Sequence, residues 1–249
     1  MKSTYLSNDV RNWFRREIEK HPNTKYRVTL SHKNIFSGSG HSVDEETPLF
    51  REIMLPILKE CEIDMAIQGH DHCYEVIGPV NPDTRTVVEG SIADTTHVSI
   101  DTNKNMTGIE GGTYTTDDGT LYFIGATCGR KRYYPYDRAE MDAAYDKHKV
   151  TNYFDLMTGM FGQPGAPSFT KFTVKEDCIE LNSYTASSSG QATLLNTMRV
   201  RRTKPHTVPF LGIENVEMPM VEGEKFIRNG QLFILKNGRV FNVIGQEVQ

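Results

Sequence analysis

The residues of this chain best suited to metal chemistry are three histidines. His32 directly follows a predicted strand at residues 26–31, and His70 and His72 follow a second predicted strand at residues 63–67. Imidazole nitrogen is a good ligand for zinc, iron and manganese, and two or three convergent imidazoles commonly form the core of a catalytic metal site. A single histidine at a strand end is more often structural or exposed, so the metal hypothesis depends on the three acting together.

The sequence Gly-His-Asp-His at residues 69–72 is the most specific of these features. One residue separates the two imidazoles, so an extended loop would project both to the same side, and Gly69 permits a sharp turn. Asp71 should point away from the metal and could orient the ligands from behind. A metallo-β-lactamase motif would need His-x-His-x-Asp-His. Tyr74 and Glu75 occupy its last two positions, which disfavours that class.

The elements before and between the histidines predict that they meet. Apolar residues recur on one face of residues 7–20, which predicts an amphipathic helix, and Thr47-Pro48 predicts the start of a second, mostly apolar helix. The order helix, strand, helix, strand is that of a β-α-β unit, whose strands run parallel. Both strands then end at one edge of the sheet, where ligands bind in open α/β folds. The predicted fold class is α/β (α+β), with His32 close to His70.

The remainder of the chain is richer in predicted β-structure. Asn237-Gly238 between two apolar runs indicates a terminal hairpin. We expect three parts: a main domain at 1–203, a proline-containing linker at 204–225 and a β-hairpin tail at 226–249. Strands are predicted at 86–88, 97–100, 121–124, 169–174, 179–184 and 194–202, and a partly helical stretch at 138–161.

Composition excludes several classes of protein. The 249 residues carry a net charge of −4, and 37% are hydrophobic, so the chain can bury a core and is not a general nucleic-acid binder. No apolar run approaches the roughly 18 residues of a membrane span, and the polar start predicts no signal peptide in this chain. The four cysteines lie far apart, without the spacing of zinc or redox motifs.

The residues around the histidines resemble a known family. Val28-Thr29-Leu30-Ser31-His32, then His41, then the run Gly69-His70-Asp71-His72-Cys73-Tyr74-Glu75 are similar to the C-terminal half of the calcineurin-like metallophosphoesterases, nearest to the purple acid phosphatase branch. The resemblance covers roughly residues 1–200 and is most specific at 26–75. It implies the C-terminal part of an αββα sandwich with mixed β-sheets.

The resemblance also implies a chemistry and a set of ligands. His32 and His70 would ligate one metal and His72 the other, and His41 would be the catalytic residue that contacts the phosphate or protonates the leaving group. The implied metals are Fe, Zn or Mn in a dinuclear centre. The implied substrate is a phosphorylated small molecule or other phosphoester, with no nucleic acid or membrane as partner. Members of this branch are often extracytoplasmic, either periplasmic or secreted.

Three of the family's five ligand blocks, the Asp, Gly-Asp and Gly-Asn-His blocks, are not found. Asp146-Lys147-His148 lies in a predicted helix after the histidine motifs and does not replace them. We expect the chain to start just after the missing blocks, through truncation, a start assigned to an internal methionine or natural loss. It would then hold at most one metal, weakly, and be weakly active or inactive. The alternative is a catalytically silent binding or structural module that retains the fold.

Two further expectations concern surfaces and the tail. Without the strands of the missing half, the sheet should expose an edge that could pair with a second copy in a homo-oligomer. Residues 226–249 are similar to the C-terminal sorting tails of proteins exported by the type IX route. A terminal hairpin packed on the main domain is the alternative, because Asn-Gly between apolar runs needs no targeting role.

Overall fold

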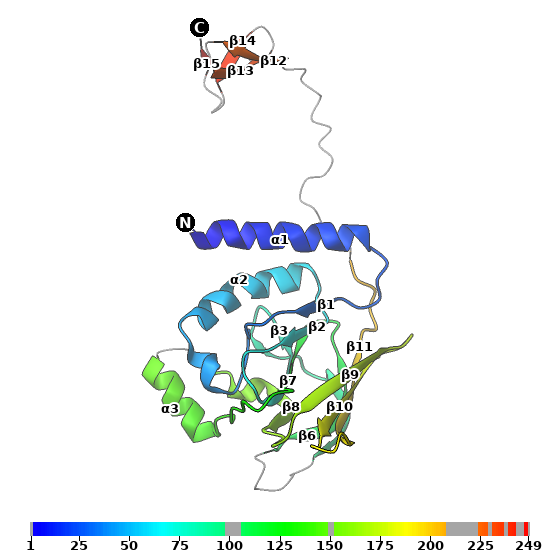
Figure 1. The fold of residues 1–249 in the computed structure, drawn as a ribbon. Helices are drawn as coiled ribbons and strands as arrows, with labels where there is room; N and C mark the ends of the chain where they lie inside the picture. Colours follow the sequence, from blue (N-terminus) through cyan, green and yellow to red (C-terminus); the bar gives the residue numbers. More distant parts are fainter. Residues whose placement is uncertain are drawn as a thin grey trace. The chain divides into compact units, whose positions relative to one another are not determined.

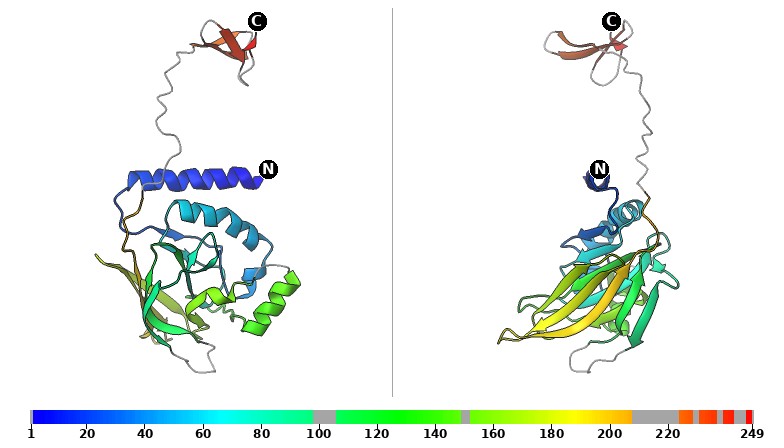
Figure 2. Two further views of the ribbon diagram at one scale, coloured as in Figure 1. Left: turned by 180° about the vertical axis from the view of Figure 1, so that it is seen from behind. Right: turned by 90° about the vertical axis from the view of Figure 1, so that its right-hand side faces the viewer.

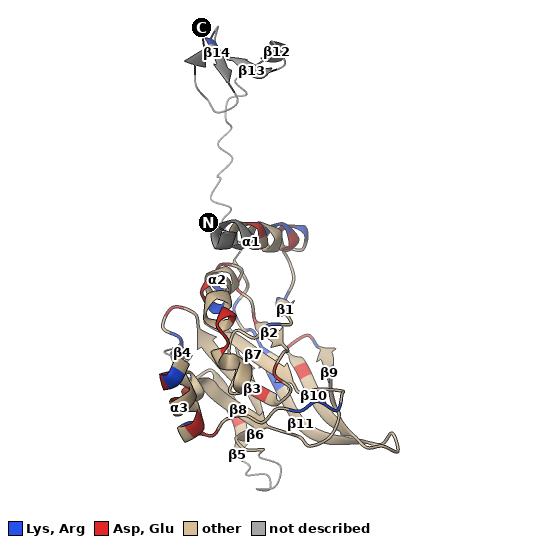
Figure 3. Ribbon diagram, turned by 60° about the vertical axis from the view of Figure 1, so that its left-hand side comes forward, with Lys and Arg blue, Asp and Glu red and all other residues tan. Residues whose placement is uncertain are grey.

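The computed structural model describes residues 2–97, 106–148, 152–207, 224–228, 231–236, 239–242 and 247–248. The chain separates into two compact units, Met1–Pro209 and Phe210–Gln249. The first unit has helices α1 (Lys2–Lys20), α2 (Glu46–Glu60) and α3 (Arg138–His148) with two β-sheets (Figure 1). Lys, Arg, Asp and Glu are spread over its helices and loops (Figure 3).

The first sheet, sheet A, is mixed and positions the histidines. Its strand order is β1-β2-β7-β3-β4, and β8 also pairs with β3. β1 and β2 are parallel, with Val28 opposite Met65, and β2 and β7 are also parallel. The strands are β1 (Val28–Leu30), β2 (Met65–Gln68), β3 (Tyr74–Asn81), β4 (Thr86–Val87), β7 (Thr120–Gly125) and β8 (Met157–Gly162). The predicted parallel pair with its crossover helix is confirmed.

The second sheet, sheet B, is mostly antiparallel. Its strand order is β5-β6-β11-β10-β9, and only the β11–β6 pair is parallel. Its strands are β5 (Ile92–His97), β6 (Ile109–Thr115), β9 (Ser168–Val174), β10 (Ile179–Ala186) and β11 (Ala192–Arg201). The hairpin predicted at 169–184 is confirmed by the β9–β10 pairing.

Sheet A forms a middle layer, with α1 and α2 against one face and sheet B against the other (Figure 2). Alternate residues of its strands therefore enter two cores, as the period of a strand requires. In β2, Ala66 packs with the helices and Met65 packs with sheet B. In β7, Tyr122 and Phe123 divide in the same way. The α/β class with stacked mixed sheets is confirmed.

Several local predictions were wrong or incomplete. Thr47-Pro48 was expected to open the second helix, with Thr47 as its cap, but α2 begins at Glu46 with Glu45 as its N-cap, so Thr47 lies inside the helix. The stretch 138–161 contains α3 but ends in strand β8. The strand expected at 97–100 lies earlier, as β5 at Ile92–His97, and residues 98–100 lie outside the described residues.

The second unit is a four-stranded antiparallel sheet ordered β12-β13-β14-β15. Its strands are β12 (Glu224–Arg228), β13 (Gln231–Lys236), β14 (Arg239–Asn242) and β15 (Glu247–Val248). Ile234 pairs with Phe241, which confirms the predicted terminal hairpin. In the described part of the chain, no helix is long and apolar enough to cross a membrane.

Candidate metal centre

His32 and His70 meet at the carboxyl ends of β1 and β2. His32 Nε2 lies 3.2 Å from His70 Nδ1, and the two rings meet edge to face. Two imidazole nitrogens bound to one tetrahedral zinc are separated by about 3.3 Å, given Zn–N distances of about 2.0–2.1 Å. The separation of these two atoms therefore fits a pair of ligands to one transition metal.

His41 reaches the same place from a short 3₁₀ helix at Gly40–Val43. Its ring stacks on that of His70, with centroids 3.8 Å apart. Asp44, three residues further on, has its Oδ2 atom 2.7 Å from His41 Nδ1 and 3.5 Å from His70 Nε2. Ligand atoms of His41, Asp44 and His70 all lie within 4.8 Å of one another. Sequence reasoning missed Asp44, although its spacing from His41 suits one helical turn.

His72 is placed differently from the other three histidines. Its Nδ1 atom lies 3.0 Å from the carbonyl oxygen of Lys131, and its ring packs on Tyr133. The Tyr133 ring in turn meets His41 edge to face. Of the four histidines expected in the site, His32 and His41 each contact His70, and His72 is connected to them through Tyr133.

Asp71 fixes the loop that carries His41. Its buried carboxylate accepts hydrogen bonds from the side chains of Asn34, Ser37 and Ser39 at 2.6, 2.5 and 3.0 Å, and from the backbone N–H of His41 at 3.3 Å. Asp71 therefore joins the loop after β1 to the loop after β2 from behind the histidines.

Glu75 lies beside Asp71 in the protein interior. Its carboxyl group accepts hydrogen bonds from the Gly38 N–H at 2.9 Å and the Cys73 thiol at 3.0 Å. Burial, and next the negative charge of Asp71, raise the pKa of Glu75 to about 7. The Glu75 carboxyl group is therefore partly protonated at neutral pH.

Lys33 adds a positive charge to the outer side of the cluster. Its Nζ atom lies 3.2 Å from His70 Nε2 and 2.6 Å from Glu46 Oε1. Burial is the main cause that lowers the pKa of His70, and the neighbouring His41 and Lys33 lower it further. A lowered pKa favours the neutral imidazole, which is the form that binds metal.

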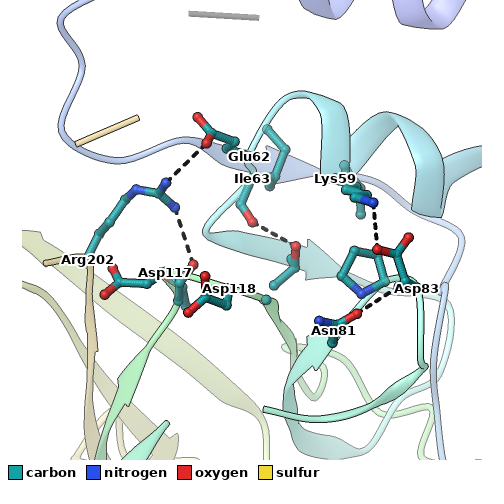
Figure 4. Close-up of a pocket in the computed structure, with 13 residues that line it drawn as sticks. Lys59, Glu62, Ile63, Asn81, Asp83, Asp117, Asp118 and Arg202 are labelled. Atoms are coloured by element: carbon teal, nitrogen blue, oxygen red, sulfur yellow. Dashed lines mark hydrogen bonds and ion pairs between the residues drawn. The ribbon is translucent and has the colours of Figure 1, made fainter. Parts of the chain in front are cut away.

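A separate hollow of about 270 Å³ lies at the opposite ends of the sheet A strands, beside Ile63 and Thr120 (Figure 4). Its acidic groups already have partners. Asp117 accepts hydrogen bonds from the backbone N–H groups of Thr203 and Lys204, and Asp118 pairs with the Lys204 ammonium. Asp117 and Asp118 are thus already paired with other groups of the protein, so the histidine cluster is the better candidate for a metal or catalytic site.

Comparison with known proteins gives two partial sequence matches. The chain is 32% identical over 66 residues to purple acid phosphatase 3 of Arabidopsis thaliana, which is 26% of this chain and 17% of that protein. It is 37% identical over 62 residues to purple acid phosphatase 7 of the same plant, which is 25% of this chain and 18% of that protein. The matches thus span less than a fifth of the length of these relatives.

Other comparisons add little. The structure of purple acid phosphatase PPD1 from yellow lupin (Lupinus luteus) seeds aligns with a TM-score of 0.40 and 18% identity over 71% of this chain and 25% of that one. No family model matches the chain. The sequence matches confirm the resemblance: about a quarter of this chain is similar in sequence to two purple acid phosphatases.

Proposed function

We propose that the protein hydrolyses phosphate monoesters or diesters at a transition-metal centre built on His32 and His70. The observation that carries this proposal is the 3.2 Å separation of His32 Nε2 and His70 Nδ1 at the end of two parallel strands. The partial similarity to purple acid phosphatases supports the reaction class. The proposed substrate is a phosphorylated small molecule or other phosphoester.

Each residue of the cluster has a proposed role. His32 and His70 would hold one metal ion. His72 would serve a second ion in the dinuclear centre of a longer parent protein, meaning one that carries the three ligand blocks not found in this chain. Bound Fe, Zn or Mn supplies a Lewis acid that polarises a phosphate ester and activates water near neutral pH. His41 would donate a proton to the departing alkoxide, and Asp44 Oδ2, 2.7 Å from His41 Nδ1, would keep that ring oriented.

The charges in the cluster support the proposal that this chain alone is weakly active. Two divalent ions repel each other by about 4 kcal/mol per pair of unit charges at ~4 Å and an effective dielectric constant of ~20. Among the described residues, Asp44 is the carboxylate in contact with the rings of His41 and His70. One carboxylate does not offset two such ions, so we propose at most one loosely held metal here, and a dinuclear centre in the parent.

The test combines metal analysis with hydrolysis of p-nitrophenyl phosphate. The purified protein is supplied with zinc, iron or manganese, and His70→Ala is compared with His148→Ala, which changes an exposed histidine on α3. We expect slow turnover and substoichiometric metal, both lost in His70→Ala and kept in His148→Ala. Equal metal content and equal turnover in the two variants would refute the proposed centre.

The alternative is a binding module that retains the fold without catalysis. The Lys33 ammonium, 3.2 Å from His70 Nε2, is the observation in its favour, because a lysine beside imidazoles can bind a phosphate group without turning it over. Inorganic phosphate that binds to the metal-free protein, together with undetectable hydrolysis after metal loading, would favour this alternative. We also propose, from the resemblance alone, an extracytoplasmic location for the parent protein.

A further inference from the structure

We propose a second cation-binding position on the outer side of His70, formed by His41, Asp44 and the Nε2 atom of His70. This position differs from the one proposed above, which uses the Nδ1 atom of His70 together with His32. Two imidazoles and one carboxylate, with ligand atoms within 4.8 Å of one another, make a donor set suited to a divalent transition metal such as Zn²⁺.

The two nitrogens of the His70 ring separate the two positions. Nδ1 faces His32 Nε2 at 3.2 Å, whereas Nε2 faces Asp44 Oδ2 at 3.5 Å. The nitrogens of an imidazole point away from each other, but a neutral ring has one unprotonated nitrogen, so His70 binds a metal ion through Nδ1 or through Nε2, and through both at once only if the ring N–H proton is lost. A cation on the Nε2 side therefore does not require His32, and a cation on the Nδ1 side does not require Asp44.

The side chain of Lys33 lies on the same side of His70 and would have to move when a metal ion binds there. Its ammonium lies 3.2 Å from His70 Nε2, and its charge is balanced by Glu46 Oε1 at 2.6 Å. The fold thus already holds a positive charge on the side of His70 where we place the cation. Lys33 has a flexible stem and is partly exposed, so its ammonium can swing into solvent when a metal ion takes its place.

Occupation of the outer position has a consequence for catalysis. A metal bound by His41 would remove that imidazole from the phosphate, so zinc in excess would inhibit hydrolysis. This consequence rests on the proposed function, in which His41 acts on the leaving group. The binding position itself rests on the geometry of His41, Asp44 and His70 alone.

The test is zinc binding to the full chain, measured by calorimetry after chelator treatment, with bound zinc counted by mass spectrometry. We compare Asp44→Asn with His32→Ala, both against the unchanged protein. The two variants and the unchanged protein all contain the exposed Cys128, so any zinc bound by that thiol is the same in each of them. We expect Asp44→Asn to weaken one zinc site by at least about tenfold and His32→Ala to retain it.

Lys33→Met provides a test in the opposite direction. Removing a positive charge next to the bound cation should strengthen the outer site by about tenfold or more. Lys59→Met is the matched control, because Lys59 is also a surface lysine paired with a carboxylate, that of Asp83. The control should leave zinc affinity unchanged, and an equal effect of both variants would overturn the assignment of Lys33.

The outcomes separate this inference from the proposed function. Zinc binding that survives Asp44→Asn unchanged overturns the outer position. A zinc site lost in both Asp44→Asn and His32→Ala also overturns it, because a single site that uses both residues would then explain the two losses. Neither result changes whether p-nitrophenyl phosphate is hydrolysed in a His70-dependent way. Conversely, an intact outer site in a protein without hydrolysis refutes only the proposed function.

Discussion

Replacement of Glu75 by glutamine should stabilise the protein at neutral and alkaline pH. Ser37 has a single hydroxyl proton, and its Oγ atom lies 2.5 Å from Asp71 Oδ2 but 3.2 Å from Glu75 Oε1. With that proton directed to Asp71, a protonated Glu75 can donate its own proton to Ser37. The amide of Glu75→Gln can donate in the same way and can still accept the Gly38 N–H.

The magnitude follows from the raised pKa of Glu75. The folded value of about 7 lies about 2.5 above the ordinary value of 4.5, and one pKa unit corresponds to about 1.4 kcal/mol. The folded protein therefore binds a proton that the unfolded chain has released between these two values, and stability falls as pH rises. The stabilising contribution is complete below about pH 4.5 and is lost, by about 3 kcal/mol in all, as pH rises through 7.

Urea unfolding followed by circular dichroism at pH 5, 6, 7 and 8 measures this effect. The free energy of unfolding of Glu75→Gln, minus that of the unchanged protein, should grow by about 2–3 kcal/mol over that range. The contributions of the other titrating groups are the same in both proteins and cancel in this difference. Glu17→Gln is the control. Glu17 is partly exposed, and its hydrogen bond with Lys20 lowers its pKa, so its trend should be small and opposite in sign. A difference for Glu75→Gln that stays flat from pH 5 to pH 8 would refute the reasoning.

Three other predictions concern the loop clamp, the sheet edge and the tail. Four donors now point at the Asp71 carboxylate. In Asp71→Asn some of them would face the N–H groups of the new amide, so the free energy of unfolding should fall by about 2–4 kcal/mol in urea titrations. β1 is an edge strand in which Leu30 is 80% exposed, so we expect two copies of the chain to associate there. Leu30→Lys should lower the molecular mass measured by light scattering. Equal masses for the variant and the unchanged protein would contradict this expectation. Strands in the described part of 210–249 pair only among themselves, so removing that segment should leave the thermal midpoint of residues 1–209 within a few degrees; a large drop would contradict separate folding.

Strands β3 and β8, which contain glycine, were not predicted as strands. β3 contains Gly78-Pro79 and β8 contains Gly159 and Gly162, and glycine and proline ordinarily indicate turns. In the structure, other parts of the backbone and side chains pack closely against Gly78 and Gly159. A Cβ atom on Gly159 would lie 2.6 Å from Val76 Cβ on the neighbouring strand. The reason for that glycine is thus a contact between segments about 80 residues apart, which no local pattern reveals.

The sequence alone determined the parallel β-α-β unit and the approach of His32 to His70. Apolar periodicity places residues in strands and helices, and parallel pairing brings strand ends together whatever the rest of the fold does. It also indicated that Asp71 would lie behind the histidines, where it accepts four hydrogen bonds from the loop after β1.

Only the tertiary structure decided which groups surround His70. Asp44, His41 and Lys33 all lie on the loop between β1 and α2, and the path of that loop is fixed by buried hydrogen bonds to Asp71 rather than by any periodic pattern. Placement of a charged side chain in such a loop depends on partners distant in sequence, because the loop has no repeating hydrogen bonds of its own. The contact of Asp44 and Lys33 with the outer nitrogen of His70 was therefore visible only once the chain was folded.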